Sequence, residues 1–280
     1  MRIAVVSAFY SEGMGYVENC LPKALATLGH DVHVIASNLN VYGNSADYDR
    51  TYRSFLGPAD QGTLHKSIDG YTLHRLDSRL VAGYVWIRNL AAKVAQIRPD
   101  VVHCTEIASL QSFLLASIRP FIGFKLFAET HQHLSVVKPF LRAPNGFLVR
   151  KAAYWLTRTL PTRLASSSVE KCYAIAPDCV DVVTRFYGVP KEKVKLQSLG
   201  TDTDHFHPAA SPDELARRSR MRRDLGYAEN DILCVYTGRL SREKNPLLLA
   251  RAVESLAEHD PAYHSLFIGE GGQKDEILRC

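Results

Sequence analysis

The first forty residues contain a strand, a helix and a second strand in direct succession. An apolar run at residues 3–6 leads into a loop with two glycines, and a leucine-rich helix then stops at Gly29. The next strand begins at Asp31. A β-α-β unit of this kind predicts parallel strands joined by a right-handed crossover. We therefore expect an α/β fold built around a parallel sheet.

The rest of the chain repeats this alternation. We expect further strands at 73–76, 101–104, 125–128, 164–168 and 194–198, with helices at 86–97, 109–117 and 147–158. The polar stretch 38–70 is expected to be an irregular loop, which in a compact domain is usually functional or mobile. A linker is expected at 203–220, where two prolines and an arginine-rich run occur.

The length of 280 residues exceeds what one hydrophobic core usually fills. We expect one domain at 1–203 and a second at 204–280, where the pattern restarts with strands at 232–237 and 264–268 and a helix at 246–258. Both are predicted to be Rossmann-like, doubly wound parallel-sheet domains. Such a domain normally has five or six strands, so the second is expected to be incomplete.

Composition excludes several classes of protein. The net charge is +5, and the basic residues do not form a nucleic-acid-binding pattern, so no nucleic-acid partner is expected. The chain has no apolar run of 18 residues and no signal-peptide pattern at its start, which predicts a cytoplasmic protein. The six cysteines lack C-x-x-C spacing and are expected to be reduced packing residues. We expect no metal site and no cofactor.

The segment 232–246 carries the most specific local chemistry. An apolar strand runs into Gly238, Arg239 follows, and Lys244 precedes a helix that begins near Pro246. The N–H groups of a helix start, a forked guanidinium and an ammonium together suit a diphosphate. The alternative is a solvated loop that opens an exposed helix.

A second glycine loop, with Gly13 and Gly15, follows the first strand. Its spacing is not the G-x-G-x-x-G of dinucleotide-binding proteins, which argues against NAD. The loop lies at the carboxyl end of a parallel strand, where such sheets bind ligands. It either lets the backbone approach a ligand or is simply a tight strand-to-helix turn.

Three histidines are expected at strand ends. His131 and His133 follow the strand at 125–128, and His103 ends the preceding one. We interpret His103 and His133 as structural and keep His131 as a candidate site residue. The remaining histidines are scattered in the sequence without ligand spacing.

Between Thr130 and Val169 the chain has no Asp or Glu. Basic residues accompany aromatic and leucine side chains there, namely Lys138, Arg142, Arg150, Lys151, Arg158 and Arg163 beside Phe140, Phe147, Leu148, Tyr154, Trp155 and Leu156. A segment of this type can lie on an anionic membrane, so peripheral membrane contact is expected. The alternative is a core helix with a solvated basic face.

The order of these motifs resembles the retaining nucleotide-sugar glycosyltransferases of the GT-B fold, family 4, also labelled glycosyl transferases group 1. Three passages carry the resemblance: Gly200-Thr-Asp202-x-x-x-Phe206-x-Pro208, Gly238-Arg239-x-x-x-x-Lys244, and Phe267-Ile-Gly269-Glu-Gly271. They resemble the family's G-V-D-x-x-x-F-x-P, G-R-x-x-x-x-K and V-G-x-G patterns. Thr201 stands where the family usually has valine.

The resemblance implies a role for each matched residue. Arg239, Lys244 and Gly15 would bind the donor diphosphate, His131 would lie near the transferring sugar, and Gly269 and Gly271 would border the nucleotide pocket. Gly200 and Asp202 belong to the interdomain passage. The first domain would be the acceptor side, and the second would bind the nucleotide sugar.

The activity implied is the transfer of a hexose, with retention, from a nucleoside-diphosphate sugar to a glycan or lipid-linked acceptor in polysaccharide biosynthesis. Arginine and lysine would take the place that Mg²⁺ fills elsewhere. The family's E-x7-E pair, which orients the donor, does not occur before Cys280, so we expect this chain to be truncated and catalytically silent. The rival interpretations are a GT-B nucleotide-sugar 2-epimerase and a non-catalytic module that keeps only the acceptor-side fold.

Overall fold

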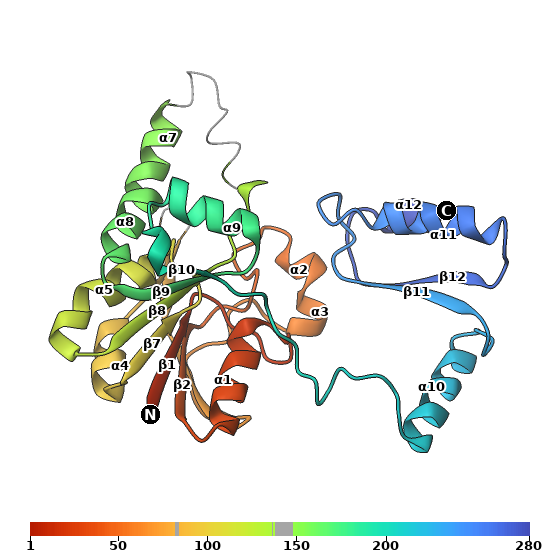
Figure 1. Ribbon diagram of the computed structural model, residues 1–280, viewed down its shortest axis with the longest axis horizontal. Coiled ribbons are helices and arrows are strands. Elements are labelled where there is room, and N and C mark those ends of the chain that lie inside the picture. Colours follow the sequence, from red (N-terminus) through yellow and green to blue (C-terminus); the bar gives the residue numbers. More distant parts are fainter. Residues whose placement is uncertain (82–83, 136, 138–147) are drawn as a thin grey trace. The chain divides into compact units, whose positions relative to one another are not determined.

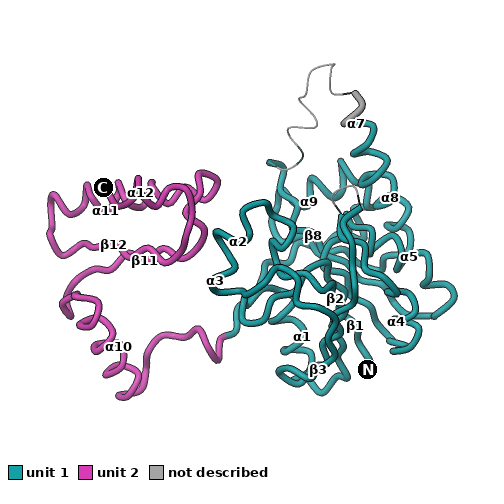
Figure 2. Tube along the Cα trace, turned by 180° about the vertical axis from the view of Figure 1, so that it is seen from behind, with its two compact units in different colours: residues 1–202 teal, residues 203–280 magenta. Residues whose placement is uncertain are grey.

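The computed structural model describes residues 1–81, 84–135, 137 and 148–280. The chain divides into two compact units, Met1–Asp202 and Thr203–Cys280 (Figures 1 and 2). Each unit has its own main sheet, mostly parallel in unit 1 and parallel in unit 2.

Unit 1 is built on an eight-stranded sheet with the order β10-β9-β8-β7-β1-β2-β4-β3 (Figure 1). Neighbouring strands are parallel except β3, which runs antiparallel to β4. The strands are β1 (Arg2–Ser7), β2 (Asp31–Ser37), β3 (Leu64–Ile68), β4 (Tyr71–Leu76), β7 (Val101–Cys104), β8 (Lys125–Thr130), β9 (Val169–Ala174) and β10 (Val194–Leu196). The predicted α/β class is confirmed.

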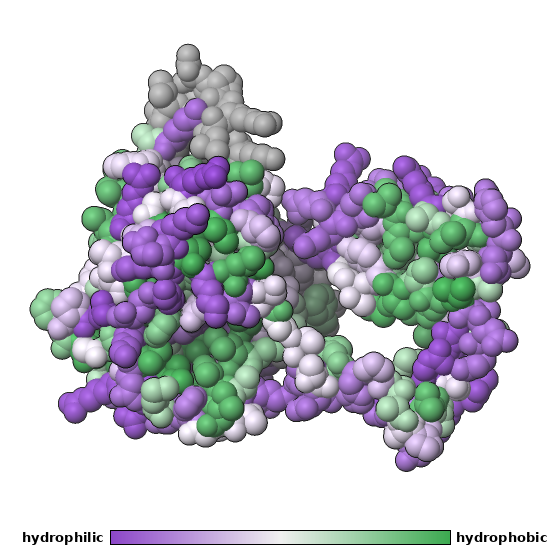
Figure 3. All heavy atoms as spheres, viewed as in Figure 1, coloured by the Kyte–Doolittle hydropathy of each residue, from purple (hydrophilic) through white to green (hydrophobic). Residues whose placement is uncertain are grey.

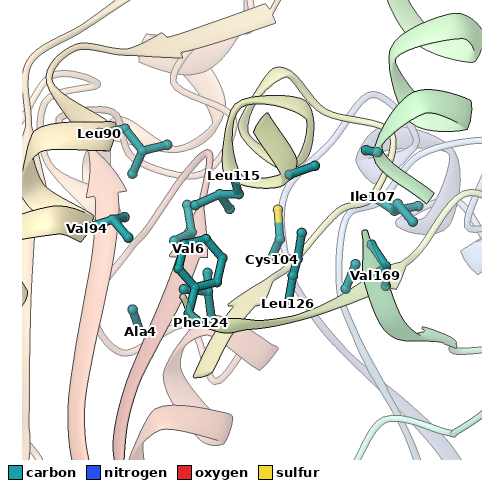
Figure 4. Packing of buried hydrophobic residues seen from close by; sticks show 14 of the residues in the cluster. Ala4, Val6, Leu90, Val94, Cys104, Ile107, Leu115, Phe124, Leu126 and Val169 are labelled. Carbon is teal, nitrogen blue, oxygen red and sulfur yellow. The ribbon is translucent and has the colours of Figure 1, made fainter. Parts of the chain in front are cut away.

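The central strand β1 explains why this sheet forms. Val5 pairs with Val34 of β2 on one side and with His103 of β7 on the other. Successive side chains point to opposite faces, so Ala4 and Val6 enter one core while Val5 enters another. Figure 4 shows Val6 packing in the first core with Leu115 and Leu126. An uninterrupted apolar strand is what a sheet covered on both faces requires.

Helices cover this sheet and connect its strands (Figure 1). They are α1 (Val17–Thr27), α2 (Tyr48–Thr51), α3 (Arg53–Leu56), α4 (Leu90–Ile97), α5 (Leu110–Ile122), α7 (Leu148–Tyr154), α8 (Leu160–Ser166) and α9 (Pro177–Asp181). The start of α5 is capped by Ser109, whose hydroxyl accepts the Ser112 N–H, and the helix ends at left-handed Gly123.

Several boundaries differ from the sequence prediction. Residues 164–168 were expected to be a strand, but α8 continues to Ser166. The observed strand is β9, which begins after the predicted range, at Val169. Ala165 is buried in the main core and Thr162 is 1% exposed, so the segment packs as a helix against the rest of unit 1.

The helix predicted at 86–97 starts later than expected. Trp86 lies in β6 (Tyr84–Ile87), which forms a small antiparallel sheet with β5 (Ser78–Val81). Asn89 adopts a left-handed conformation with φ 57°, and α4 begins at the next residue. The polar stretch 38–70 is also less irregular than predicted, because it contains α2, α3 and β3.

Unit 2 contains α10 (Pro212–Asp224), β11 (Ile232–Thr237), α11 (Pro246–Ala257), β12 (Tyr263–Ile268) and α12 (Lys274–Ile277). The strands pair in parallel, with Val235 opposite Leu266. The arginine-rich run, predicted to be linker, is helix α10. Its start is stabilised by a capping box in which Ser211 accepts the Glu214 N–H while the Glu214 carboxylate accepts the Ser211 N–H. Within the described residues, none of the helices has the length and apolarity needed to cross a membrane.

Candidate functional site

A cluster of charged side chains lies at the carboxyl edge of the unit 1 sheet. Glu129, at the end of β8, is only 5% exposed and stands between two histidines. Its Oε1 is 3.2 Å from His131 Nε2, and its Oε2 is 3.4 Å from His103 Nε2. Because β7 and β8 are adjacent and parallel, their ends bring these three side chains together.

These contacts are close but poorly aligned as hydrogen bonds. His103 Nε2, Glu129 Oε1 and His131 Nε2 are buried polar atoms that make no well-directed hydrogen bond within the described structure. Buried polar atoms in folded proteins usually have such a partner. Charge and proximity, rather than directed hydrogen bonds, therefore hold these three side chains together.

The carboxylate and the imidazole stabilise each other's charge. Burial raises the pKa of Glu129, but the neighbouring imidazoles of His103 and His131 outweigh it, so the net pKa is lowered. Burial lowers the pKa of His131, yet Glu129, with smaller contributions from Glu106 and Glu18, gives a net increase. The arrangement favours a charged carboxylate beside a cationic imidazole.

Two further carboxyl groups belong to this cluster. Glu18 lies buried in the first turn of α1, and burial raises its pKa to about 7. Glu106 follows β7 and accepts the N–H groups of Ala108 at 2.9 Å and His131 at 3.4 Å. Burial raises the pKa of Glu106 as well. Neither group was predicted from the sequence.

The loop with Gly13 and Gly15 joins β1 to α1 and so reaches the same edge of the sheet. Both glycines have positive φ, 73° and 65°, while a Cβ at either would meet open space. Backbone conformation, rather than crowding, accounts for glycine here. A role of Gly15 at a diphosphate stays a prediction.

Several histidines besides His131 make specific contacts in the folded chain. His103, interpreted as structural, contacts the same carboxylate as His131. His133 is 48% exposed and pairs with Asp178 at 3.1 Å. His33 and His65, which the sequence did not bring together, both contact the buried His74, each at 3.0 Å between ring nitrogens.

In unit 2 the two predicted glycine loops pack backbone against backbone. Gly238 N donates to Ile268 O at 3.0 Å, and Leu240 N donates to Glu270 O at 2.9 Å. A Cβ on Gly269 would lie 1.9 Å from Gly238 O, and one on Gly271 would lie 2.4 Å from Leu240 O. Close backbone packing therefore explains why glycine occurs at these positions. Their place at a nucleotide pocket stays a prediction.

The two predicted diphosphate-binding cations lie in the first of these loops. Lys244 is exposed, while Arg239 Nη2 approaches Glu243 Oε2 at 3.6 Å. That distance is long for an ion pair, and a partly exposed pair of this kind contributes little to stability. Their binding role stays a prediction.

The two remaining predictions concern the interdomain passage and the basic segment. Gly200 and Asp202 lie at the end of unit 1, where Asp202 forms an ion pair with Lys23 of α1. Much of the basic segment lies outside the described residues, including Lys138, Phe140, Arg142 and Phe147, and the side chains of Leu148 and Arg150 are likewise not described. In its described part, Arg158 lies 3.9 Å from the centre of the Tyr84 ring.

The fold places the chain in the GT-B structural class. The crystal structure of Anabaena HepE in complex with UDP is similar, with a TM-score of 0.58 and 17% identity over 100% of this chain and 64% of HepE. A glycosyltransferase from Rickettsia africae gives a TM-score of 0.56 and 16% identity over 99% of this chain and 62% of that protein.

Sequence comparison identifies the family. The glycosyltransferase family 4 profile matches residues 13–205, so the chain belongs to that family. It is 34% identical over 196 residues to a Bacillus subtilis (strain 168) protein named as glycosyltransferase EpsD, covering 67% of this chain and 45% of EpsD. The chain thus spans less than half of that relative.

Proposed function

We propose that this chain belongs to a glycosyltransferase that moves a hexose from a nucleoside-diphosphate sugar to a glycan or lipid-linked acceptor with retention of configuration. The observation that carries this proposal is the charged cluster at the carboxyl edge of a family 4 fold, where Glu129 holds His131. The UDP complex of HepE supports a uridine-type donor class.

Arg239 and Lys244 are assigned to the donor diphosphate. A departing nucleoside diphosphate develops negative charge, which a forked guanidinium and an ammonium stabilise without a metal ion. Both side chains follow a strand end and precede α11, and the N-terminal end of that helix's dipole adds to the positive potential.

His131 is assigned to the sugar. Its Nε2 lies 3.2 Å from Glu129 Oε1, and the charge of that carboxylate favours a protonated imidazole, a hydrogen-bond donor suited to a sugar hydroxyl. Glu129 does not contact the sugar in this scheme and acts as a positioning residue.

The test uses the natural full-length protein and several nucleotide sugars, with donor hydrolysis and transfer as readouts. Arg239→Ala and Lys244→Ala should each lower transfer by about 10²-fold or more, because losing one charged contact to a developing charge costs about 3 kcal/mol. Arg242→Ala, which removes an exposed cation from the same loop, is the matched control. Unchanged rates in the first two variants would contradict the assignment.

His131→Ala should reduce kcat more than nucleotide affinity. His133→Ala, two residues further along the same loop, removes an exposed ring and should affect mainly stability. Equal losses of kcat would refute the distinction. Absence of donor hydrolysis and of transfer by the full-length protein would favour the non-catalytic module.

We also propose peripheral contact with an anionic membrane. Trp155, Leu156 and Leu164 are exposed apolar residues in the acid-free segment, near the basic Lys151 and Arg163. Each surface cation contributes roughly 1 kcal/mol on an anionic leaflet, and salt screens that attraction. Co-sedimentation should show salt-sensitive binding to anionic vesicles and none to neutral ones; equal binding to both, or none, would remove the proposal.

A further inference from the structure

A second side-chain cluster lies near the charged site but shares no residue with it. His133 follows β8, and Asp178 and Cys179 lie in α9, which follows the adjacent parallel strand β9. One ligand atom from each of the three lies within 4.8 Å of the other two. Imidazole, carboxylate and thiol are the groups that bind Zn²⁺ in proteins.

The distances measured from the His133 ring are close to those that a single ion requires. Nδ1 of His133 is 3.1 Å from Asp178 Oδ2, 3.2 Å from Oδ1 and 3.8 Å from the sulfur of Cys179. Zn²⁺ binds nitrogen and oxygen at about 2.0–2.2 Å and sulfur at about 2.3 Å, so tetrahedral ligand atoms lie roughly 3.3–3.6 Å apart. The observed separations lie on either side of that range.

The surroundings hold two of the three ligands in place. The Asp178 carboxylate accepts the Leu134 N–H at 3.1 Å, which fixes it across the loop from α9. Cys179 is buried, so its side chain is confined by the surrounding residues. The exposed ring of His133 provides the side from which an ion can enter.

We propose that His133, Asp178 and Cys179 bind Zn²⁺, with water at the fourth position. Binding displaces the thiol proton to solvent and connects the loop after β8 to α9. The competing interpretation is a surface histidine-aspartate pair beside a packing cysteine. This proposal does not depend on glycosyl transfer, because its readouts are metal binding and stability.

The test titrates the 280-residue chain with Co²⁺ and Zn²⁺ under reducing conditions. A Co²⁺–thiolate bond should give a near-ultraviolet charge-transfer band, displaced by one equivalent of Zn²⁺. His133→Gln and Asp178→Asn should each weaken binding by at least about tenfold, since losing even an outer partner of a metal ligand costs 10–100-fold. The amide introduced by Asp178→Asn keeps an oxygen for the Leu134 N–H, so this variant should remain folded.

Cys179→Ser should abolish the charge-transfer band. Cys20→Ser, which removes a half-exposed thiol from α1, is the matched control and should keep it. Because Cys179 is buried and its variant could unfold, circular dichroism must show that the fold is retained. A Co²⁺ affinity that is unchanged in the His133 and Asp178 variants, or no band in the unaltered chain, would overturn the proposal.

Discussion

The sheets of the two units differ in how completely their strands are covered. In unit 1, β1 lies between β2 and β7, and Val5 is 0% exposed. In unit 2, β11 pairs with β12, and Val235 is 52% exposed (Figure 3 shows apolar atoms on the viewed face of this unit). Full burial of a valine contributes about 1.5–3 kcal/mol, so similar apolar strands receive unequal stabilisation.

The loops of unit 2 are tightly packed, unlike its strands. Gly238 and Leu240 hydrogen-bond to the loop after β12, and Gly269 fits only because it has no Cβ. The proposed diphosphate-binding loop is therefore ordered by backbone contacts rather than by a large core. A site of this kind can keep its local geometry while the neighbouring strands remain partly exposed.

Amide hydrogen exchange should show the largest difference between the units. Amides in β1, β7 and β8 should exchange near the rate of global unfolding. Those in β11 and β12 should exchange through local opening, which requires less free energy. We expect at least about a thousandfold slower exchange near Val5, Val102 and Phe127 than near Val235 and Phe267. Mass spectrometry of peptides from each strand measures this, and comparable protection throughout would contradict the comparison.

The sequence predicted the central strands of unit 1 well because their side chains are apolar on both faces. Prediction failed where local pattern and tertiary context disagree. Trp86 follows Val85 in an apolar run that could start a helix, but Asn89 in a left-handed conformation separates β6 from α4. At Ser166, the packing of α8 through the buried Ala165 overrides a serine-rich stretch that resembled a strand end.

The candidate site was only partly predictable. His131 was identified from its position after a strand, and a signal for Glu129 was present because residues two apart in an extended segment point to the same side. The contact with His103 depends on which strands are neighbours. The burial of Glu18 depends on how the start of α1 packs within unit 1, which no local pattern specifies.

A glycine substitution tests whether the two loops of unit 2 are closely packed. Gly269→Ala should destabilise unit 2 by on the order of 2–3 kcal/mol, because its Cβ would lie 1.9 Å from a backbone oxygen. Gly272→Ala, with no atom within 4 Å of the added Cβ, should change stability by less than about 0.5 kcal/mol. The exchange rate of β11 amides measures the stability change in both variants. Equal effects of the two substitutions would mean that the loops are packed no more closely than the strands.

The smallest expected effect concerns pH and is confined to unit 1. Burial, then the nearby charge of Lys93, lowers the pKa of His74 to about 4, and burial also lowers that of His33. Asp31 lies 3.2 Å from His33 Nε2 and also pairs with Arg2 at 2.7 Å. A histidine whose folded pKa is lowered binds fewer protons than in the unfolded chain. Its contribution is therefore complete above the unfolded pKa of 6.5 and is lost as pH falls toward 4.

Glu18 changes the free energy of unfolding with pH in the opposite direction from His74. Each group is therefore tested by comparison with a variant that lacks it. Its folded pKa of about 7 lies above the ordinary value of 4.5, so its contribution is present at low pH and is lost as pH rises through 7. The unaltered chain should lose about 1–2 kcal/mol between pH 7 and 5 relative to His74→Gln, and gain stability relative to Glu18→Gln over the same range. Chemical denaturation followed by the fluorescence of Trp86 and Trp155, both in unit 1, measures each difference. Parallel curves for all three proteins would show that neither buried group is coupled to folding. A matching shift in β11 exchange would show that the two units do not respond to pH independently.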